Sequence, residues 1–584
     1  MVVDLPKAAH TAAITEIAAV LAEFTGTRQL ESGELASYHG WFQHGWALTG
    51  LCVDPALELR VLLPSTVPFF PPRIAVAPPP PALTWPHLED HGLLCLLPEV
   101  ANVSIVRTAQ VVTTMLEDAR KLVNASLSGS NLQDFEDEFT SYWERWERSK
   151  STVRCFCEPA KSSRNLIGWA STDGWYVAED ENFLRSWIAN RFGKGSPKKI
   201  TCWPVPLLWL PRPLRPAEYP TTVAALRAIF QENPQPRGIL DTTLLGEKPD
   251  EKLILLGATS RNGLAFAGVL IHKLAGLKNG FRTQPPQEVA LARYGAATTT
   301  GACIVRFDPE WVHGRDQNPE TRVLRGKQIV IVGVGSVGSI VADLLVKAGV
   351  GKLTLVDPQE LDSANSSRHL LGAPSVAVNK AEAVAHNLTE RFPHLSATAV
   401  AKSITDLLQP VAASLRSSDL TICLTGNWPT ESLLNAVWQE AELPPVLYGW
   451  AEPHAAAGHA LMLMPRGGCL RCVVDEMGRN RVPVTTWPRD TMLHIPACGG
   501  VFQPYGAAEL AHIGALVAEL ALDLLLQRVL QSTYRVWIGS HRMVQRAGGA
   551  WNPAWIAVRG NPAAGGQIVD VPFTPSCTDC GVTL

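Results

Sequence analysis

A strand, a glycine-rich turn and a helix follow one another near residue 330, and this order limits the fold more than any other feature of the chain. KQIVIVGVGSVGSIVADLLVKAGVGKLTLVDP contains an apolar strand, the pattern G-x-G-x-x-G, a helix-length segment and a second strand. A helix that connects two strands in this way makes them parallel neighbours. NKAEAVAHNLTERF, ATAVAKSI and LTICLTG continue the alternation, and the tail segments VWIGSHRMV and WNPAWIAVRG are expected to be strands. The sequence therefore predicts a doubly wound α/β domain over 301–584.

Three glycines and one aspartate define the expected ligand site of this domain. Gly333, Gly335 and Gly338 let the main chain turn tightly and approach a phosphate, which the N-terminus of the following helix attracts. Asp357 ends the next strand, where a carboxylate accepts the hydroxyl groups of a ribose. A glycine turn without a ligand is the alternative, but the order of strand, turn and helix favours nucleotide binding.

The residues after Asp357 distinguish between two reactions of a nucleotide. The usual interpretation of such a turn is NAD binding by a dehydrogenase. Here Asn365, Arg368 and Lys380 follow, and hydride transfer needs no arginine and lysine on phosphates. Adenylation needs them, because negative charge develops on the α-phosphate and on pyrophosphate when a carboxylate attacks. The sequence therefore favours an adenylating site.

This segment resembles the ThiF/MoeB and ubiquitin-activating-enzyme family, which carries the glycine turn, a strand-end aspartate, an N-x-x-R element and a later lysine in this order. By the resemblance, four residues bind the ribose and phosphates of ATP: Asp357, Asn365, Arg368 and Lys380. The resemblance also implies homodimers, in which Arg315 reaches the ATP of the partner subunit.

One position departs from this family. The aspartate that helps to hold Mg²⁺ is replaced by Gly426, so the sequence leaves the magnesium ligand open. Asn427 follows it, and a helix N-cap explains this residue as well as a functional role does.

Two C-x-x-C pairs indicate a metal site. Cys469 and Cys472 form the first pair, and Cys577 and Cys580 form the second, close to the carboxyl terminus. Four thiolates match a tetrahedral Zn²⁺ site, and two such pairs in one chain favour structural zinc over a redox role. The ThiF/MoeB-like family has the same pairing. Zinc with four thiolates has no open position, so we expect it to tie the tail to the α/β core.

Cys498 is the first candidate nucleophile. It lies in a Pro- and Gly-rich loop, HIPACGGVFQPYG, before a long apolar helix, and a helix N-terminus favours the thiolate. A buried cysteine without a chemical role is the alternative. The ThiF/MoeB-like family places its crossing-loop cysteine here, and the resemblance implies that Cys498 forms a thioester.

The first part of the chain, 1–150, predicts an α+β domain. Its amino-terminal segment has the pattern of an amphipathic helix and not of a signal peptide. GWALTGLCVD, LELRVLL and RIAVA have strand composition. Two helical segments follow, of which LQDFEDEFTSYWERWER is the last.

Cys95 is the second candidate nucleophile. Before it stand a proline turn, PFFPP, the element WPH, and the sequence GLLC, whose cysteine is Cys95. These motifs and their spacing resemble the ubiquitin-conjugating (UBC) family, which implies that Cys95 is catalytic. His87 stands where that family has an oxyanion-stabilising Asn, and a histidine also donates a hydrogen bond, although a loop histidine is the alternative. His91 is expected either to lower the thiol pKa or to be an exposed loop residue.

The middle part, 151–300, carries many Trp and Pro residues and is expected to be a folded spacer domain. Six further cysteines in apolar or strand-like surroundings are expected in protein cores: Cys52, Cys155, Cys157, Cys202, Cys303 and Cys423.

Composition excludes several classes of function. The 584 residues carry a net charge of −3, which lacks the basic footprint of a nucleic-acid binder. No apolar run approaches the length of a membrane span, so no membrane association is expected. Without a secretion signal, the 12 cysteines suit a reducing cytoplasm.

Together these features predict a relay within one chain. ATP adenylates the C-terminal carboxylate of a protein, Cys498 forms a thioester, Cys95 accepts the acyl group, and a lysine of a target attacks it. The order of the parts resembles the fused enzyme of bacterial CBASS antiphage operons, which implies a cGAS-like nucleotidyltransferase as the activated protein. ATP, Mg²⁺ and Zn²⁺ are the implied cofactors.

Three alternatives stay open. A fused enzyme for a bacterial ubiquitin-like modifier uses the same chemistry. A sulfur-carrier activator of the ThiF/MoeB type is disfavoured, because it needs no UBC-like domain. A nucleotide-binding scaffold without activity is consistent with Gly426 and His87, the two departures from the family patterns.

Overall fold

The protein is described by a computed structural model over 7–97, 102–146, 151–193, 200–246, 249, 251–274, 280–282, 285–404, 415–441, 443–496, 501–575, 577 and 579–580. It divides into two compact units. One unit comprises 1–154, 160–179 and 201–305, and the other comprises 155–159, 180–200 and 306–584. No helix in the described part of the chain is long and apolar enough to cross a membrane. The division into three domains stays a prediction.

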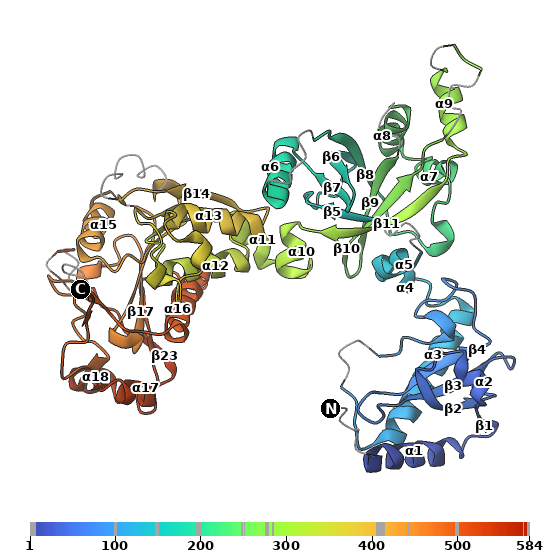
Figure 1. The fold of residues 1–584 in the computed structure, drawn as a ribbon, viewed down its shortest axis with the longest axis horizontal. Coiled ribbons are helices and arrows are strands. Elements are labelled where there is room, and N and C mark those ends of the chain that lie inside the picture. The colour runs from blue at the N-terminus through green and yellow to red at the C-terminus, as the bar shows by residue number, and fades with distance from the viewer. Residues whose placement is uncertain are drawn as a thin grey trace. The chain divides into compact units, whose positions relative to one another are not determined.

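The N-terminal domain is an antiparallel sheet covered by helices, drawn in blue in Figure 1. Its strands pair in sequence order: β1 (Thr27–Gln29), β2 (Phe42–Leu48), β3 (Glu58–Pro64) and β4 (Arg73–Ala77). Its helices are α1 (Lys7–Leu21), α2 (Ser32–Ala36), α3 (Thr108–Ser128), α4 (Asp134–Asp137) and α5 (Phe139–Trp146). Apolar residues of α1, α3 and the sheet form one core, so the predicted α+β fold is confirmed.

The middle part of the chain forms a closed β-barrel, an architecture that the sequence did not predict (Figure 1). Its strands are β5 (Thr152–Cys155), β6 (Arg164–Ser171), β7 (Gly174–Ala178), β8 (Trp203–Trp209), β9 (Lys252–Ser260), β10 (Gly263–Ile271) and β11 (Thr299–Arg306). Helices α7 (Val223–Ile229), α8 (Pro234–Leu245) and α9 (Gln287–Tyr294) accompany it, and α6 (Glu181–Phe192) belongs to the second unit. Closure pairs every strand and leaves no open edge.

The C-terminal domain is built on an eight-stranded mixed sheet of order β14-β13-β12-β15-β16-β17-β21-β23. The strands, in this order, are Ser396–Val400, Lys352–Val356, Gln328–Val332, Leu420–Cys423, Val446–Ala451, Ala457–Leu463, Thr533–Ile538 and Gln567–Val571. The first five strands are parallel and the last three run antiparallel to their neighbours. Two short two-stranded antiparallel sheets pair β18 (Thr485–Thr486) with β22 (Ala550–Trp551) and β19 (Leu493–His494) with β20 (Val501–Phe502).

Helices cover both faces of this sheet. They are α10 (Pro309–Gly314), α11 (Glu320–Arg325), α12 (Ser336–Ala348), α13 (Lys380–Arg391), α15 (Trp428–Ala441), α16 (Ala507–Leu525), α17 (His541–Arg546) and α18 (Pro553–Arg559). Ile329 and Ile331 of β12 pack with α12, α13 and α16, whereas Val330 and Val332 pack with α15, α17 and α18. Burial on both faces explains the continuous apolar run of β12, and the predicted doubly wound domain is confirmed.

The strand prediction for the tail is right only in part. VWI of the segment VWIGSHRMV lies in β21, as predicted, but HRMV lies in α17, and α18 occupies most of WNPAWIAVRG. Ser540 and Asn552 accept main-chain N–H bonds at the start of the two helices. Pro553 also favours a first helical turn. The capping residues at the starts of α17 and α18 therefore outweigh the strand-like composition of these segments.

Of the six cysteines expected in cores, four are buried, whereas Cys202 and Cys303 are half-buried.

We predict that Trp143→Ala destabilises the first unit by about 3–5 kcal/mol. Trp143 of α5 is 1% exposed and packs in the barrel core, with its ring 4.8 Å from that of Tyr219. Trp143→Phe conserves most of the volume and is expected to cost less than about 1.5 kcal/mol. Urea unfolding followed by circular dichroism measures both changes. An unchanged midpoint for Trp143→Ala would contradict this packing.

Candidate active sites

Cys95 lies on a short segment at the edge of the N-terminal sheet, and its side chain is exposed. The segment is held by main-chain bonds: Leu94 N–H donates to Ile74 O at 2.8 Å, and Cys95 N–H donates to His87 O at 2.9 Å. Gly92 makes the approach possible, because it has φ +79° and a Cβ there would lie 2.3 Å from Val76 O. The structure therefore brings Cys95 and His87, predicted from separate motifs, onto one pair of neighbouring segments.

Two carboxylates act on the Cys95 thiol. Partial burial raises its pKa above the usual range, and the negative charges of Glu89 and Glu138 raise it further. Arg73 opposes them, but it also forms an ion pair with Glu89 at 2.8 Å. His91 is not among the groups that shift this pKa, and the alternative expectation for it, an exposed residue, is confirmed. His91 is exposed, and its Nε2 lies 3.0 Å from Nε2 of His39.

The ring of His87 lies between two carboxylates. Its Nε2 is 3.2 Å from Oδ2 of Asp134, and its Nδ1 is 3.5 Å from Oε2 of Glu138. Its main-chain N–H donates to the Tyr142 hydroxyl at 2.9 Å, and that hydroxyl donates to Glu138 at 3.2 Å. Sequence analysis missed these three partners. The i, i+4 spacing of Asp134 and Glu138 in an acidic helical segment was the available signal.

A cavity of about 240 Å³ opens at the carboxyl ends of β12 and β13. Its lining includes Gly333, Gly335, Asp357 and Lys380, so four of the predicted nucleotide-binding residues lie together. Gly338 lies behind the turn, where a Cβ would be 2.0 Å from Gly333 O. A Cβ at Gly335 would meet no protein atom within 4 Å. Gly338 therefore allows the helix to pack against the turn, whereas Gly335 leaves open space beside the cavity.

Asp357 and Lys380 are both buried beside this cavity. The Asp357 carboxylate accepts the N–H groups of Val334 at 2.8 Å and Gln359 at 2.9 Å. Each oxygen keeps a second lone pair, which suits a ribose hydroxyl. Lys380 Nζ donates to Gln359 Oε1 at 2.8 Å, so Gln359 holds the lysine at the cavity wall.

Arg368 lines a different cavity, of about 510 Å³, together with Tyr505 and Glu509. Its guanidinium donates to Asn365 Oδ1 at 2.7 Å and lies 5.4 Å from the centre of the Tyr505 ring. The predicted contact between Asn365 and Arg368 is thus present. Arg368, however, lines a different cavity from the one that Lys380 lines. Arg315 is exposed and ends α10 in a left-handed conformation, with φ +46°.

The residues around Gly426 do not fit a magnesium site. Gly426 has φ +56° and faces open space, and Asn427 Oδ1 accepts Thr430 N–H at 3.1 Å at the start of α15. The carboxylate of Glu431 accepts the Thr425 hydroxyl at 3.0 Å, and burial raises its pKa. Among the described residues that line the cavity, Asp357 supplies the sole carboxylate, and it already binds two N–H groups. We therefore assign no step to Mg²⁺.

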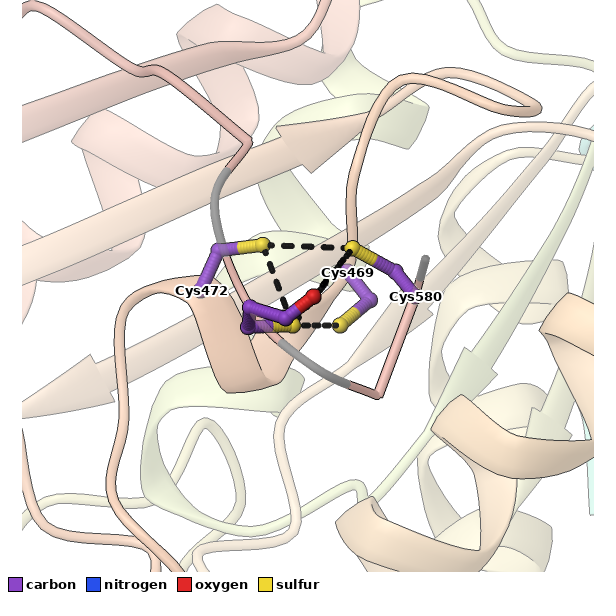
Figure 2. A group of neighbouring side chains, drawn as sticks. Cys469, Cys472 and Cys580 are labelled. Atoms are coloured by element: carbon purple, nitrogen blue, oxygen red, sulfur yellow. Dashed lines mark hydrogen bonds between the residues drawn. The ribbon is translucent and has the colours of Figure 1, made fainter. Parts of the chain in front are cut away.

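The four predicted metal ligands form one cluster, which Figure 2 shows. The sulfur atoms of Cys469, Cys472, Cys577 and Cys580 all lie within 4.8 Å of one another. Four of the separations are 3.4, 3.6, 3.7 and 3.4 Å. Tetrahedral zinc with bonds of about 2.3 Å requires about 3.8 Å between sulfurs, so the cluster fits Zn²⁺.

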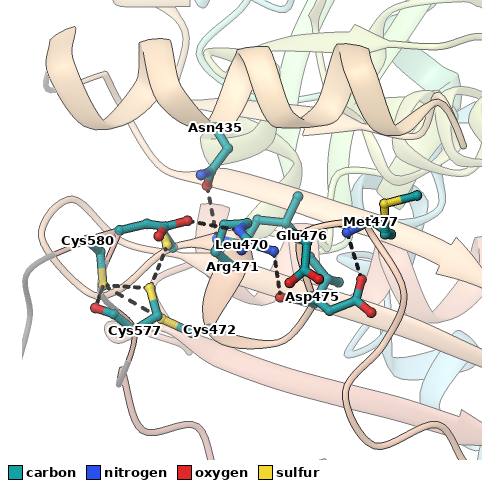
Figure 3. Close-up of polar contacts among 12 residues, drawn as sticks. Asn435, Leu470, Arg471, Cys472, Asp475, Glu476, Met477, Cys577 and Cys580 are labelled. Atoms are coloured by element: carbon teal, nitrogen blue, oxygen red, sulfur yellow. Dashed lines mark hydrogen bonds and ion pairs between the residues drawn. The ribbon is translucent and has the colours of Figure 1, made fainter.

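Polar contacts hold both pairs of this cluster, as Figure 3 shows. Asn435 of α15 is buried, and its Oδ1 accepts Leu470 N–H at 2.9 Å. Arg471 forms an ion pair with Asp579 at 2.8 Å, which joins the first pair to the second. The cluster therefore connects the tail to the sheet through α15.

Cys498 lies outside the described residues. The chain on either side of it forms the β19–β20 hairpin, with Leu493 opposite Phe502 and both side chains exposed. Helix α16 begins at Ala507, after this hairpin. Phe502 and Tyr505 line the same cavity as Arg368, so the loop after Cys498 returns to that wall.

Comparison with protein families decides what the two halves are. Residues 46–152 match prokaryotic E2 family B, and residues 314–542 match the ThiF family. The chain joins an E2-family domain to a ThiF-family domain. By this content it is an activating and conjugating enzyme of the ubiquitin-transferase-like type. The E2-family segment contains Cys95, and the ThiF-family segment contains the glycine turn and Cys469.

Relatives match most of the chain. An ATP-dependent ubiquitin transferase-like protein Cap2 of Pseudomonas aeruginosa is 28% identical over 504 residues, which are 83% of this chain and 88% of that protein. The Cap2 of Vibrio cholerae is 24% identical over 442 residues, 69% of this chain and 73% of that one. A crystal structure of E. coli MccB with ATP has a TM-score of 0.31 and 18% identity, and the match covers 45% of this chain and 68% of that one.

We predict that Glu89→Gln and Glu138→Gln each speed alkylation of Cys95 by iodoacetamide at pH 8, by about two- to fivefold. The native carboxylates raise the thiol pKa, so less thiolate exists below that pKa, and neutralising one carboxylate restores part of it. Above the pKa the difference should vanish. Mass spectrometry of the Cys95 peptide measures the rate, with exposed Glu23→Gln as control. Slower alkylation of either variant would contradict the electrostatic assignment.

Proposed function

We propose that this protein uses ATP to adenylate the C-terminal carboxylate of a protein and then ligates that carboxylate to a target amine. The observation that carries the proposal is the presence, in one chain, of a glycine-turn cavity with Asp357 and Lys380 and of the exposed Cys95 on an E2-family sheet. Activation and transfer are the two halves of acyl ligation. ATP-dependent adenylation with ubiquitin-like conjugation also agrees with the two family matches.

In the activation step, the C-terminal carboxylate attacks the α-phosphate of ATP and pyrophosphate leaves. In this step, Asp357 binds the ribose of ATP, and the N-terminus of α12 and Lys380 bind the phosphates. These groups oppose the negative charge that develops on the phosphates. Arg368, which donates to Asn365, lines the second cavity and gives the entering carboxylate a cationic wall. Homodimers in which Arg315 reaches the partner subunit's ATP also belong to the proposal.

Two thiol transfers follow in the proposal. Cys498 attacks the acyl-adenylate and releases AMP, and Cys95 then takes the acyl group by thiol exchange. A lysine amine of a target finally displaces Cys95. His87, joined to Cys95 through the main chain, is proposed to serve this last step. The contacts of its ring with two carboxylates favour a positioning role over the oxyanion role that the UBC resemblance implies.

The activated protein is proposed to be a cGAS-like nucleotidyltransferase with a free C-terminus. The support is the similarity to the two Cap2 proteins over most of the chain, together with the order of the domains. A ubiquitin-like modifier is the second candidate, because the chain also resembles ubiquitin-like modifier-activating enzyme 5 of Culex quinquefasciatus, at 27% identity over 242 residues.

We predict that a candidate substrate forms a thiol-sensitive adduct on a non-reducing gel when ATP and Mg²⁺ are present. Cys498→Ala should remove every adduct. Cys95→Ala should keep the adduct on Cys498 and lose ligation to lysine. Lys380→Ala should slow pyrophosphate release by about 100-fold, because one charge-stabilising group is lost.

Lys352→Ala is the matched control, because this lysine of β13 is exposed and lies away from the cavity. It should leave pyrophosphate release unchanged. A bound substrate without any adduct would overturn the proposal in favour of a nucleotide-binding scaffold. The identity of the protein that forms the adduct separates the nucleotidyltransferase from the modifier.

We further propose that the four-cysteine cluster holds Zn²⁺, and predict that the purified protein contains one zinc ion at this site. Cys577→Ser should lose the metal and lower the melting temperature by several degrees, because the tail is then released from α15. Elemental analysis and thermal unfolding measure both effects. Cys202→Ser, outside the cluster, should keep the metal. Full zinc content in Cys577→Ser would contradict the assignment.

A further inference from the structure

His369 is a buried histidine whose two ring nitrogens both have main-chain partners, and the proposed reaction does not use it. Its Nε2 lies 2.9 Å from the carbonyl oxygen of Val334, and its Nδ1 lies 3.1 Å from the main-chain nitrogen of Leu371. The residue is 8% exposed. A carbonyl oxygen only accepts and a main-chain N–H only donates. One neutral tautomer, with its proton on Nε2, therefore satisfies both contacts.

The contact with Val334 fixes the glycine turn. Val334 is fully buried and lies between Gly333 and Gly335, which line the cavity of about 240 Å³. Its N–H donates to Asp357 Oδ2 at 2.8 Å, and its carbonyl oxygen accepts the Nε2–H of His369. The two peptide groups of the turn are therefore held from two sides, one by the end of β13 and the other by the segment that follows it.

His369 also fixes the segment that carries Arg368, which directly precedes it in the chain. Leu370 N–H donates to the Ser339 hydroxyl of α12 at 3.2 Å. The side chain of Leu371 is buried in the apolar core of the domain. Together with the bond from His369 to the turn, these contacts hold the main chain after Arg368 against the glycine turn and α12.

The Arg368 side chain depends on this support. Its guanidinium donates to Asn365 Oδ1 at 2.7 Å and to Ala364 O at 3.1 Å, and both partners belong to the short helical turn Ser363–Asn365 before it. Its Nε is shielded from solvent and has no hydrogen-bond partner among the described residues. A buried donor without an acceptor is costly, so this N–H suits an anionic oxygen of a ligand. On the other side of Arg368, the chain is anchored through His369.

The charge state of the ring agrees with its two contacts. Burial lowers the pKa of His369 and the positive charge of Lys380 lowers it further, whereas the bond to Val334 and the charge of Asp357 oppose them. The ring is therefore neutral near pH 7. A protonated ring would turn a second N–H toward the N–H of Leu371 and lose that bond.

We propose that His369 is a positioning residue that holds Arg368 at a fixed place relative to the glycine turn. The inference rests on the proposed function, in which ATP occupies the cavity at Gly335 and Arg368 faces the entering carboxylate. Attack on the α-phosphate requires both reactants to be aligned, and a small displacement of either one slows it strongly. His369 contacts neither reactant and acts through Val334 and Arg368.

The test separates nucleotide binding from the reaction in the full-length protein. Calorimetry measures binding of α,β-methylene-ATP, which cannot release pyrophosphate. Pyrophosphate release is followed with ATP, Mg²⁺ and a candidate nucleotidyltransferase. His369→Leu should weaken binding of the analogue at least fivefold and lower kcat at saturating ATP at least 10-fold. His369→Gln supplies one donor and one acceptor and should keep both values within about threefold of native.

A double-mutant cycle tests whether His369 acts through Arg368. Arg368→Ala should lower kcat about 100-fold, because a charge-stabilising group is lost. Adding His369→Leu to this variant should lower kcat less than a further twofold, since the group that His369 positions is already absent.

His394→Leu is the matched control. His394 is a histidine of the same domain that pairs with His313 at 2.7 Å, and it lies in the lining of neither cavity. This variant should change neither binding nor kcat. His369→Asn, whose amide is too short to reach Val334, provides a second variant that keeps a polar side chain and should give the losses expected of His369→Leu. Thermal unfolding checks that each variant is folded.

Four results would overturn the inference. They are native kcat in a folded His369→Leu or His369→Asn, native binding of α,β-methylene-ATP by the same variants, equal losses in His369→Gln and His369→Leu, and a further 10-fold loss in the double variant. The last result would show that His369 acts independently of Arg368. Absence of pyrophosphate release by the native protein would overturn the proposed function, and the inference with it.

Discussion

The close approach of the main chain at Gly333 to helix α12 at Gly338 is the constraint on which the C-terminal domain depends. A Cβ at Gly338 would lie 2.0 Å from Gly333 O, so any larger residue pushes the helix away from the turn. With glycine there, α12 begins directly behind the turn and its N-terminus faces the cavity. The Asp357 carboxylate then reaches the N–H of Val334 and closes the turn from the neighbouring strand. The cavity is the space that this arrangement leaves at the strand ends.

The four-cysteine cluster brings together two cysteine pairs that are distant in the sequence. Cys469 and Cys577 are 108 residues apart, and their sulfurs lie 3.4 Å from each other. With the proposed Zn²⁺ bound, a cross-link of this span would restrict the unfolded chain and fix the tail without a large apolar core. The hydrogen bond from Leu470 to Asn435 connects the cluster to α15, whose first turn borders the cavity that Gly335 and Asp357 line. The cluster thus supports the site without taking part in its chemistry.

The Cys95 site is built by two structures at once. The sheet supplies the cysteine and the main-chain bond to His87, whereas α4 and α5 supply Asp134, Glu138 and Tyr142. These helices are buried against the barrel, so the middle of the chain is more than a connector. The Glu136–Arg215 ion pair and the contact of the Trp143 ring with that of Tyr219 attach these helices to the closed barrel. The geometry around Cys95 therefore depends on residues from both parts of the chain.

Sequence by itself determined the features that are local. The β12–α12 unit follows from apolar runs and glycine spacing, and the four thiol ligands follow from two short pairs, because each pattern is complete within a few residues. Tertiary structure alone decided which patterns meet. It placed Lys380 at the Gly335 cavity but Arg368 at another, it closed the middle strands into a barrel, and it brought Glu138 to the ring of His87. The physical reason is that side-chain periodicity reports which face of an element is buried, but not which distant element buries it.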